Sequence, residues 1–258
     1  MTARIRSIAF NTFREAVRDR VLYNLIVFAL LMISSSLLMG QVTIGIQRQL
    51  LINLGLTAIS IFGVLIAIFI GIGLVSKEIE KRTLYTVLTR PVRRWEFIVG
   101  KFFGLVGTLV VNAGFMAFGF FAALLFLMRS FQKSDLYLLG AIYFIVLQFM
   151  IVTAVALLFS SFSTPILSAV FTFSVFVIGS FSEDLRGFAS LTHGPARWLA
   201  TGLSYLVPNF SALNVIASVA HDQPVASSLI LYNTLYALVY AGALISAASL
   251  IFQHRNMK

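Results

Sequence analysis

The stretch Lys77–Lys101 reads KEIEKRTLYTVLTRPVRRWEFIVGK and separates two long apolar runs. It holds seven Lys/Arg and three Glu, whereas LGLTAISIFGVLIAIFIGIGLV lies before it and FFGLVGTLVVNAGFMAFGFFAALLFL lies after it. An uncharged run of about 20 residues is long enough to cross a bilayer as a helix. The two runs therefore predict membrane spans, and the polar stretch predicts a connection in water on one side of the membrane.

The composition assigns the whole chain to the membrane class. Of its 258 residues, 59% are hydrophobic and 11% are charged, whereas soluble domains carry about 25% charged residues. The net charge of +10 fits the excess of Lys/Arg on cytoplasmic loops of membrane proteins. No run has the pattern of a nucleic-acid binder, so we expect no nucleic-acid partner. The 258 residues contain no cysteine, which excludes disulfides and thiolate metal sites within them.

Six apolar runs are long enough to be membrane spans. They are Val21–Met39, Leu50–Val75, Phe102–Met128, Leu136–Phe159, Ile166–Phe181 and Ala226–Phe252. Pro165 precedes the fifth and shortest run, and proline suits the first turn of a helix. We expect an all-α polytopic membrane protein in which residues 1–258 form a single transmembrane domain.

Lys and Arg are distributed unequally between the connections. With six spans, the N-terminal arm, the second and fourth connections and the C-terminal tail lie on one side and carry 14 Lys/Arg, whereas the other side carries 5. The positive-inside rule then predicts that both termini and Lys77–Lys101 are cytoplasmic.

Two segments outside the spans have helical patterns. Residues 1–20 place Ile5, Ile8 and Phe13 opposite several arginines, which predicts an interfacial amphipathic helix with its apolar face in the lipid boundary. The alternative is a solvated arm that only supplies orienting charge. Residues 183–225 are the longest such segment, and the topology makes them extracytoplasmic. Their part PARWLATGLSYLVP is too short to span, so we expect a short interfacial or re-entrant helix before the last span.

The predicted spans contain no Asp, Glu, Lys, Arg or His. Such residues mark proton relays and ion paths, so their absence argues against a proton-coupled pump, a charge-ringed channel and an intramembrane hydrolase. His193, His221 and His254 lack metal-ligand spacing, and no G-x-x-x-x-G-K-[ST] loop occurs. We therefore expect no catalytic residue, no metal and no cofactor in this chain.

Uncharged polar residues in the spans are candidates for a substrate path, although most such groups hydrogen-bond between helices. The candidates are Asn53, Asn112, Gln148 and Asn233. Gly100–Gly104, which reads GKFFG, is a G-x-x-x-G motif that we interpret as a close-packing device.

Residues 77–91 contain more than a topology signal needs. Leu84 and Leu88 give a short apolar face, and Arg90 precedes Pro91, which biases Arg90 toward extended geometry and ends a helix near Thr89. We interpret the segment as a short cytoplasmic helix that docks a soluble partner. The alternative is that its charges only fix the topology.

The same residues resemble the signature of ABC transporter permeases of the second exporter class, the ABC type-2 permeases. That signature has Glu, then Thr and Leu, then Pro and a basic residue, and Gly-Lys at the start of the third span. The resemblance and the polar pattern of the segment together give the residues that we expect to couple to a partner: Lys77, Glu78, Glu80, Arg82, Thr83, Leu84, Leu88, Arg90, Pro91, Arg93 and Arg94. The segment LVPNF at Leu206–Phe210 also resembles these permeases.

The resemblance implies a mechanism. Such permeases work as pairs, here with a second copy or a similar permease, on two separate P-loop subunits that bind ATP and Mg²⁺. Closure of those subunits pushes the coupling helices and alternates access to a central path. The resemblance also implies that the chain is an exporter subunit in a bacterial or archaeal inner membrane.

Two other functions stay open from the sequence. One is a membrane scaffold or assembly component of a cofactor-maturation system without direct transport. The other is a secondary transporter, which predicts internal inverted repeats; residues 21–128 and 136–252 show no convincing self-similarity.

Overall fold

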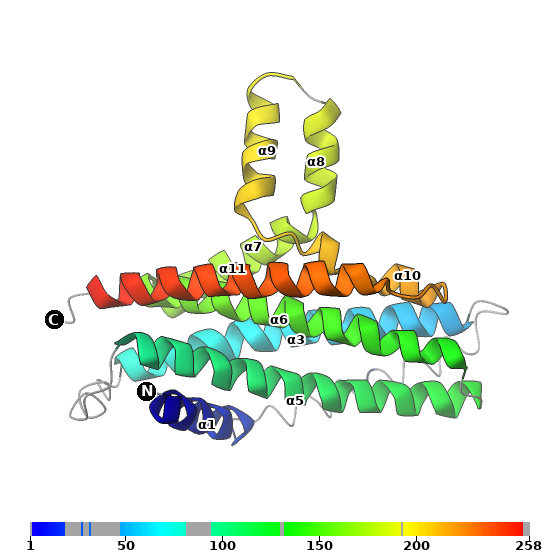
Figure 1. The fold of residues 1–258 in the computed structure, drawn as a ribbon, viewed down its shortest axis with the longest axis horizontal. Coiled ribbons are helices and arrows are strands. Elements are labelled where there is room, and N and C mark those ends of the chain that lie inside the picture. The colour runs from blue at the N-terminus through cyan, green and yellow to red at the C-terminus, as the bar shows by residue number, and fades with distance from the viewer. Residues whose placement is uncertain are drawn as a thin grey trace.

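The structure of the protein is a computed structural model that describes residues 2–18, 27, 31, 47–80, 94–129, 132–191 and 193–254. The elements of these residues are all helical (Figure 1), which confirms the predicted all-α class. They are α1 (Thr2–Arg18), α3 (Gln47–Glu80), α5 (Arg94–Met128), η1 (Lys133–Leu136), α6 (Tyr137–Phe162), α7 (Pro165–Ser180), α8 (Ser182–Leu191), α9 (Pro195–Leu206), η2 (Ser211–Leu213), α10 (Ile216–Ala220) and α11 (Ser227–His254).

Four helices of the described residues are long and apolar enough to cross a membrane singly. They contain Gln47–Gly73, Trp95–Phe126, Lys133–Phe162 and Ser227–Phe252. Two bent helix pairs, α7 with α8 and α9 with Ser211–Ala220, raise the number to six if each pair is one span. By length and composition the chain is therefore a multi-pass membrane protein. The first predicted span, Val21–Met39, lies outside the described residues apart from positions 27 and 31.

Two apolar clusters hold the helices together. The larger joins α3, α5, α6 and α10 and contains fully buried Ile52, Phe120 and Phe144. The smaller joins α1, α5, α6 and α11, with Ile98 and Ala248 at its centre. The long helices consequently form one bundle with a common axis (Figure 1).

α3 and α6 lie side by side and run in the same direction. The hydroxyl of Ser60 donates a hydrogen bond to Oε1 of Gln148 at 3.1 Å. Further along both helices, a Cβ at Gly71 would lie 3.3 Å from Cβ of Ala156. Small residues at facing positions let apolar helices approach closely in a membrane. In these contacts the residue numbers increase along both helices, so α3 and α6 are parallel. α5 lies between them in the sequence and must therefore cross the bundle in the opposite direction.

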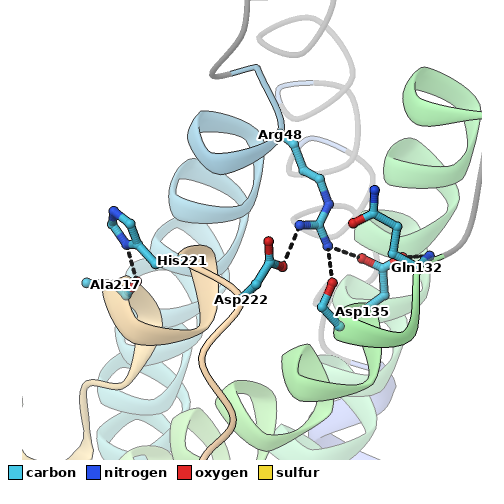
Figure 2. A network of polar contacts seen from close by, with 7 residues as sticks. Arg48, Gln132, Asp135, Ala217, His221 and Asp222 are labelled. Carbon is cyan, nitrogen blue, oxygen red and sulfur yellow. Dashed lines mark hydrogen bonds and ion pairs between the residues drawn. The ribbon is translucent and has the colours of Figure 1, made fainter.

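The two ends of the bundle carry different contacts. At one end Arg48, in the first turn of α3, pairs with Asp135 of η1 at 2.7 Å and with Asp222, after α10, at 2.5 Å (Figure 2). At the other end the rings of Phe97 and Phe252 stack, joining the start of α5 to the end of α11. The first, third and fifth connections therefore meet at one end, which is the arrangement that the predicted topology requires.

α1 packs along the first half of α5, where two glycines make room for it. A Cβ at Gly100 would lie 2.7 Å from Cγ2 of Ile8, and one at Gly104 would lie 2.5 Å from the carbonyl oxygen of Ala9. The G-x-x-x-G motif is thus a close-packing device, and its partner is α1. The sequence analysis places the apolar face of α1 in lipid, but in the structure this face packs on α5, because the two glycines leave room for it. Phe10 of α1 is exposed.

A helical hairpin, α8–α9, follows the shortest predicted span, which corresponds to α7. α7 ends at Ser180, α8 bends away from it by 60°, and α9 returns toward the bundle (Figure 1). α10 then packs on α3 and α6 with Val219 and Ala220 buried. The expected extracytoplasmic segment 183–225 therefore contains a buried helix as well as the short helix at its centre. With five residues, α10 is too short to give a span signal of its own in the sequence.

Candidate functional site

The four polar candidates for a substrate path lie in the bundle and differ in burial and in hydrogen-bond partners. Asn53 is half-buried, and the others are buried: Asn112, Gln148 and Asn233. Gln148 is used in the contact between α6 and α3. Nδ2 of Asn233 donates to the carbonyl oxygen of Ala212 in η2 at 3.3 Å. The contacts of Gln148 and Asn233 thus tie helices together, as most polar groups in membrane bundles do.

Asn112 differs from these residues. It lies near the middle of α5, its exposed fraction is 6%, and its Nδ2 has no hydrogen-bond partner among the described residues. Leaving such a donor unpaired in an apolar surrounding costs on the order of 1–3 kcal/mol. Asn112 therefore carries a buried amide donor that no described residue uses.

Asn209 organises the base of the hairpin, which we define as residues 206–214. Its side-chain oxygen accepts hydrogen bonds from the hydroxyl of Ser182 at 2.5 Å and from the backbone N–H of Ala212 at 3.0 Å. Its own N–H donates to the hydroxyl of Tyr236 on α11 at 2.8 Å. Irregular backbone at membrane depth needs such partners, because lipid offers none.

Two more contacts fix the hairpin base to its neighbours. The N–H of Phe210 donates to the carbonyl oxygen of Gly179 at 3.1 Å, and the hydroxyl of Tyr240 donates to that of Leu206 at 3.0 Å. A Cβ at Gly179 would overlap the carbonyl oxygen of Pro208. The segment LVPNF, which the sequence marks only by resemblance, is therefore where the chain re-enters the bundle.

The start of α5 buries two charged side chains that sequence reasoning placed in a polar connection. Glu96 is 3% and Lys101 is 1% exposed, and Nζ of Lys101 lies 5.5 Å from the ring centroid of Phe97. α5 begins at Arg94, eight residues before the predicted span, so both residues lie on a helix that is packed in the bundle. A buried charge is costly to move away from the groups that stabilise it, so the first turns of α5 are firmly fixed in the bundle.

The residues assigned to coupling are only partly within the described residues. Lys77, Glu78 and Glu80 continue α3 to its last residue, and Arg94 begins α5. The rest lie outside the described residues: Arg82, Thr83, Leu84, Leu88, Arg90, Pro91 and Arg93. The proposed coupling segment thus starts as the end of a spanning helix rather than as a separate helix from Lys77.

The described part of the bundle carries several hydrogen-bonding hydroxyls and amides. Within the described residues, no group of three His, Cys, Asp or Glu side chains could hold a metal ion. The polar contacts inside the bundle join hydroxyls and amides to backbone or to one another. Such an arrangement can position helices or line a path.

A comparison with protein families matches residues 6–256 to a family described as ABC-2 family transporter protein. The chain belongs to the ABC-2 family of transporters. The match extends over nearly the whole chain, from α1 through the hairpin to the end of α11, and it confirms the resemblance seen in the sequence. No curated protein matches the chain.

Membership fixes the general role of this ABC-2 protein. The family consists of membrane permeases of ABC transporters, and the apolar helices described above agree with a multi-pass subunit of that kind. The arrangement of α1, α5 and the hairpin base gives this permease its particular geometry.

Proposed function

We propose that this ABC-2 permease is the membrane subunit of an ATP-driven exporter and that residues 77–91 form its coupling helix. A separate P-loop subunit binds ATP and Mg²⁺ and docks on this segment. The permease works as a pair, with a second copy or a similar permease, in a bacterial or archaeal inner membrane. Both termini face the cytoplasm.

The observation that carries the proposal is the anchoring of the helix that follows the segment. α5 starts with buried Glu96 and Lys101, and its Gly100 and Gly104 hold α1. A force applied to residues 81–93 would therefore reach α5 and α1 together, since both helices share one packed surface. Rigid packed elements are what transmit a push across a protein.

The charge pattern agrees with a docking surface for a soluble protein. Residues 77–94 contain six of the chain's Lys/Arg together with two glutamates. Mixed charges of this kind give electrostatic complementarity, which fixes the register of a partner more than it adds affinity.

Asn112 is our candidate for contact with the exported molecule. Its Nδ2 is the buried amide donor without a partner among the described residues, whereas Gln148 and Asn233 already bond within the bundle. Asn112→Leu should lower the rate of export without lowering the melting temperature. The apolar side chain removes the proposed contact with the exported molecule and also removes the cost of the unpaired donor. Asn53, Gln148 and Asn233 remain candidates of lower rank.

The test is co-purification with the ATP-binding subunit in lipid nanodiscs. The permease is tagged and purified from its native host, and the eluate is assayed for ATP hydrolysis. The double substitution Glu78→Arg/Arg90→Glu should release the ATPase. Asp184→Arg/Arg197→Glu, in the hairpin at exposed positions, should retain it. If the wild-type permease carries no ATPase, or if both doubles retain it equally, the coupling assignment is wrong.

A further inference from the structure

The contacts of Arg48 join three segments that are far apart in the sequence. Its guanidinium donates to Asp135 at 2.7 Å, to the hydroxyl of Ser134 at 3.0 Å and to Asp222 at 2.5 Å (Figure 2). A cation in the first turn of a helix is unfavourable by itself, because the N-terminal end of the helix dipole is positive. Two carboxylates offset this cost, so the three segments depend on one another.

We propose that Arg48, Asp135 and Asp222 form a latch with one fixed arm, Arg48–Asp135, and one releasable arm, Arg48–Asp222. Release of the second arm frees α10 from α3 and α6 and opens the end of the bundle opposite α1. The inference goes beyond the proposed function, since it concerns contacts within this chain and can be tested without an ATP-binding partner.

The fixed arm is built into the protein interior. The side chain of Asp135 is 1% exposed, and its second oxygen accepts the backbone N–H of Gln132 at 2.8 Å. That carboxylate bond is the Asp135 half of a capping box on η1, and the N–H of Asp135 donates to the backbone carbonyl oxygen of Gln132 at 3.0 Å. A buried carboxylate cannot leave its cation cheaply, so Arg48 stays with α6 when the latch opens.

The releasable arm has the opposite character. The side chain of Asp222 is 47% exposed, so water can replace Arg48 as its partner. Asp222 lies on the turn after α10 and has φ of 59°, in the left-handed region that costs a non-glycine residue energy. Exposed ion pairs are weak, and this one holds a strained turn, so it is the arm that yields first.

The release would act on α10, because this helix depends on the latch at one end. Val219 and Ala220 are 1% and 0% exposed against α3 and α6. The N–H of Asp222 donates to the carbonyl oxygen of Val219 at 3.0 Å, so a shift of the turn is passed to the last turn of α10. At the other end the hairpin base holds the chain through Asn209. α10 is therefore a short segment between a fixed anchor and a releasable one.

The absence of cysteine from the sequence makes a direct accessibility test possible. Val219→Cys reports on the buried face of α10, and Ser218→Cys, at an exposed position on the same helix, is its matched control. Each is combined with Asp222→Asn, Asp135→Asn or Asp184→Asn, the last being an exposed carboxylate in the hairpin. A membrane-impermeant maleimide then labels the permease in nanodiscs.

Asp222→Asn should raise the labelling rate of Val219→Cys about fivefold, the shift expected when one exposed ion pair is lost. Asp184→Asn should leave that rate unchanged, and Ser218→Cys should be labelled at the same rate in every background. Asp135→Asn should lower the melting temperature by more than Asp222→Asn does. If Asp222→Asn leaves Val219→Cys as protected as before, or if the two Asp variants lower the melting temperature equally, the latch is overturned.

Discussion

Gly104 lies where the backbone of α1 passes closest to α5. A Cβ there would be 2.5 Å from the carbonyl oxygen of Ala9 and 2.7 Å from Cβ of Thr12. Gly63 has the same role in another contact, because the ring of Phe149 occupies the place of its missing side chain. At this scale the bundle depends on a few positions without a side chain more than on the identity of its many apolar residues.

Gly104→Ala should destabilise the docking of α1 by about 1–3 kcal/mol, the usual cost of overpacking a well-packed contact. The backbone of α1 cannot move aside without losing its other contacts to α5. Limited proteolysis should then cleave the N-terminal arm faster. Gly114→Ala, on the same helix and with nothing within 4 Å of its added Cβ, should behave as wild type. Equal protection of the arm in both variants would contradict this account.

Asp222 should make the stability of the fold depend on pH in the acid range. The hydrogen bond from Arg48 holds the pKa of Asp222 below its usual value of 3.8. A carboxylate with a lowered pKa stabilises the fold above its ordinary pKa and loses that contribution as the pH falls through the lowered value. The melting temperature should therefore be higher for wild type than for Asp222→Asn at pH 6–8, by an amount equivalent to at most about 1 kcal/mol. The difference should shrink as the pH falls below 3.8 and vanish once the carboxylate of Asp222 is protonated in the folded protein; a difference that stays constant on acidification would refute the assignment.

The hairpin base joins two short helices, α7 and α10, to the bundle. α7 and α10 are each too short to cross a bilayer, and the hairpin between them stands away from the bundle (Figure 1). The exposed backbone at the break is satisfied by Asn209, Tyr236 and Tyr240. An interrupted helix is tolerated at membrane depth only where protein groups replace the lost helical hydrogen bonds.

Gly179→Ala should weaken the contact between α7 and the hairpin base. Its added Cβ would overlap the carbonyl oxygen of Pro208 and lie 2.7 Å from Cδ2 of Phe210. The hairpin base would have to move, which would lengthen the bond from Phe210 N–H to the carbonyl of residue 179. We expect a loss of about 1–3 kcal/mol, measured as a lower melting temperature in detergent. Gly187→Ala in α8, where an added Cβ meets nothing within 4 Å, is the control, and equal melting of the two variants would argue against the hairpin base as an anchor.

For the whole molecule, the contacts assign each connection to an end of the bundle. Arg48, Asp135 and Asp222 mark one end, and α1 with the start of α5 marks the other. Single cysteines at exposed Arg6 and Gln223 should therefore react with an impermeant reagent from opposite sides of a sealed vesicle. The excess of Lys/Arg predicts that Arg6→Cys is reached from the cytoplasmic side. Labelling of both from one side would contradict the topology.

The long spans were predictable because an apolar run of membrane length carries its own signal. α3, α6 and α11 each begin and end within a few residues of the predicted runs. The start of α5 was missed because Glu96 and Lys101 look like residues of a polar connection, and only the packed surroundings show that they are buried. The ion pairs of Arg48 could not be predicted, because both of its partners come much later in the chain. Contacts between distant segments leave no periodic pattern in the sequence.

The docking of α1 on Gly100 and Gly104 has a consequence for biogenesis. α1 leaves the ribosome before α5, since the surface that receives it is synthesised only after α3. Until then its apolar stripe needs another partner, and the lipid surface beside the translocon is the one within reach. We expect the nascent α1 to rest on the membrane, as its amphipathic pattern suggests, and to exchange lipid for protein once α5 has been inserted. Its sequence is therefore suited to two successive environments.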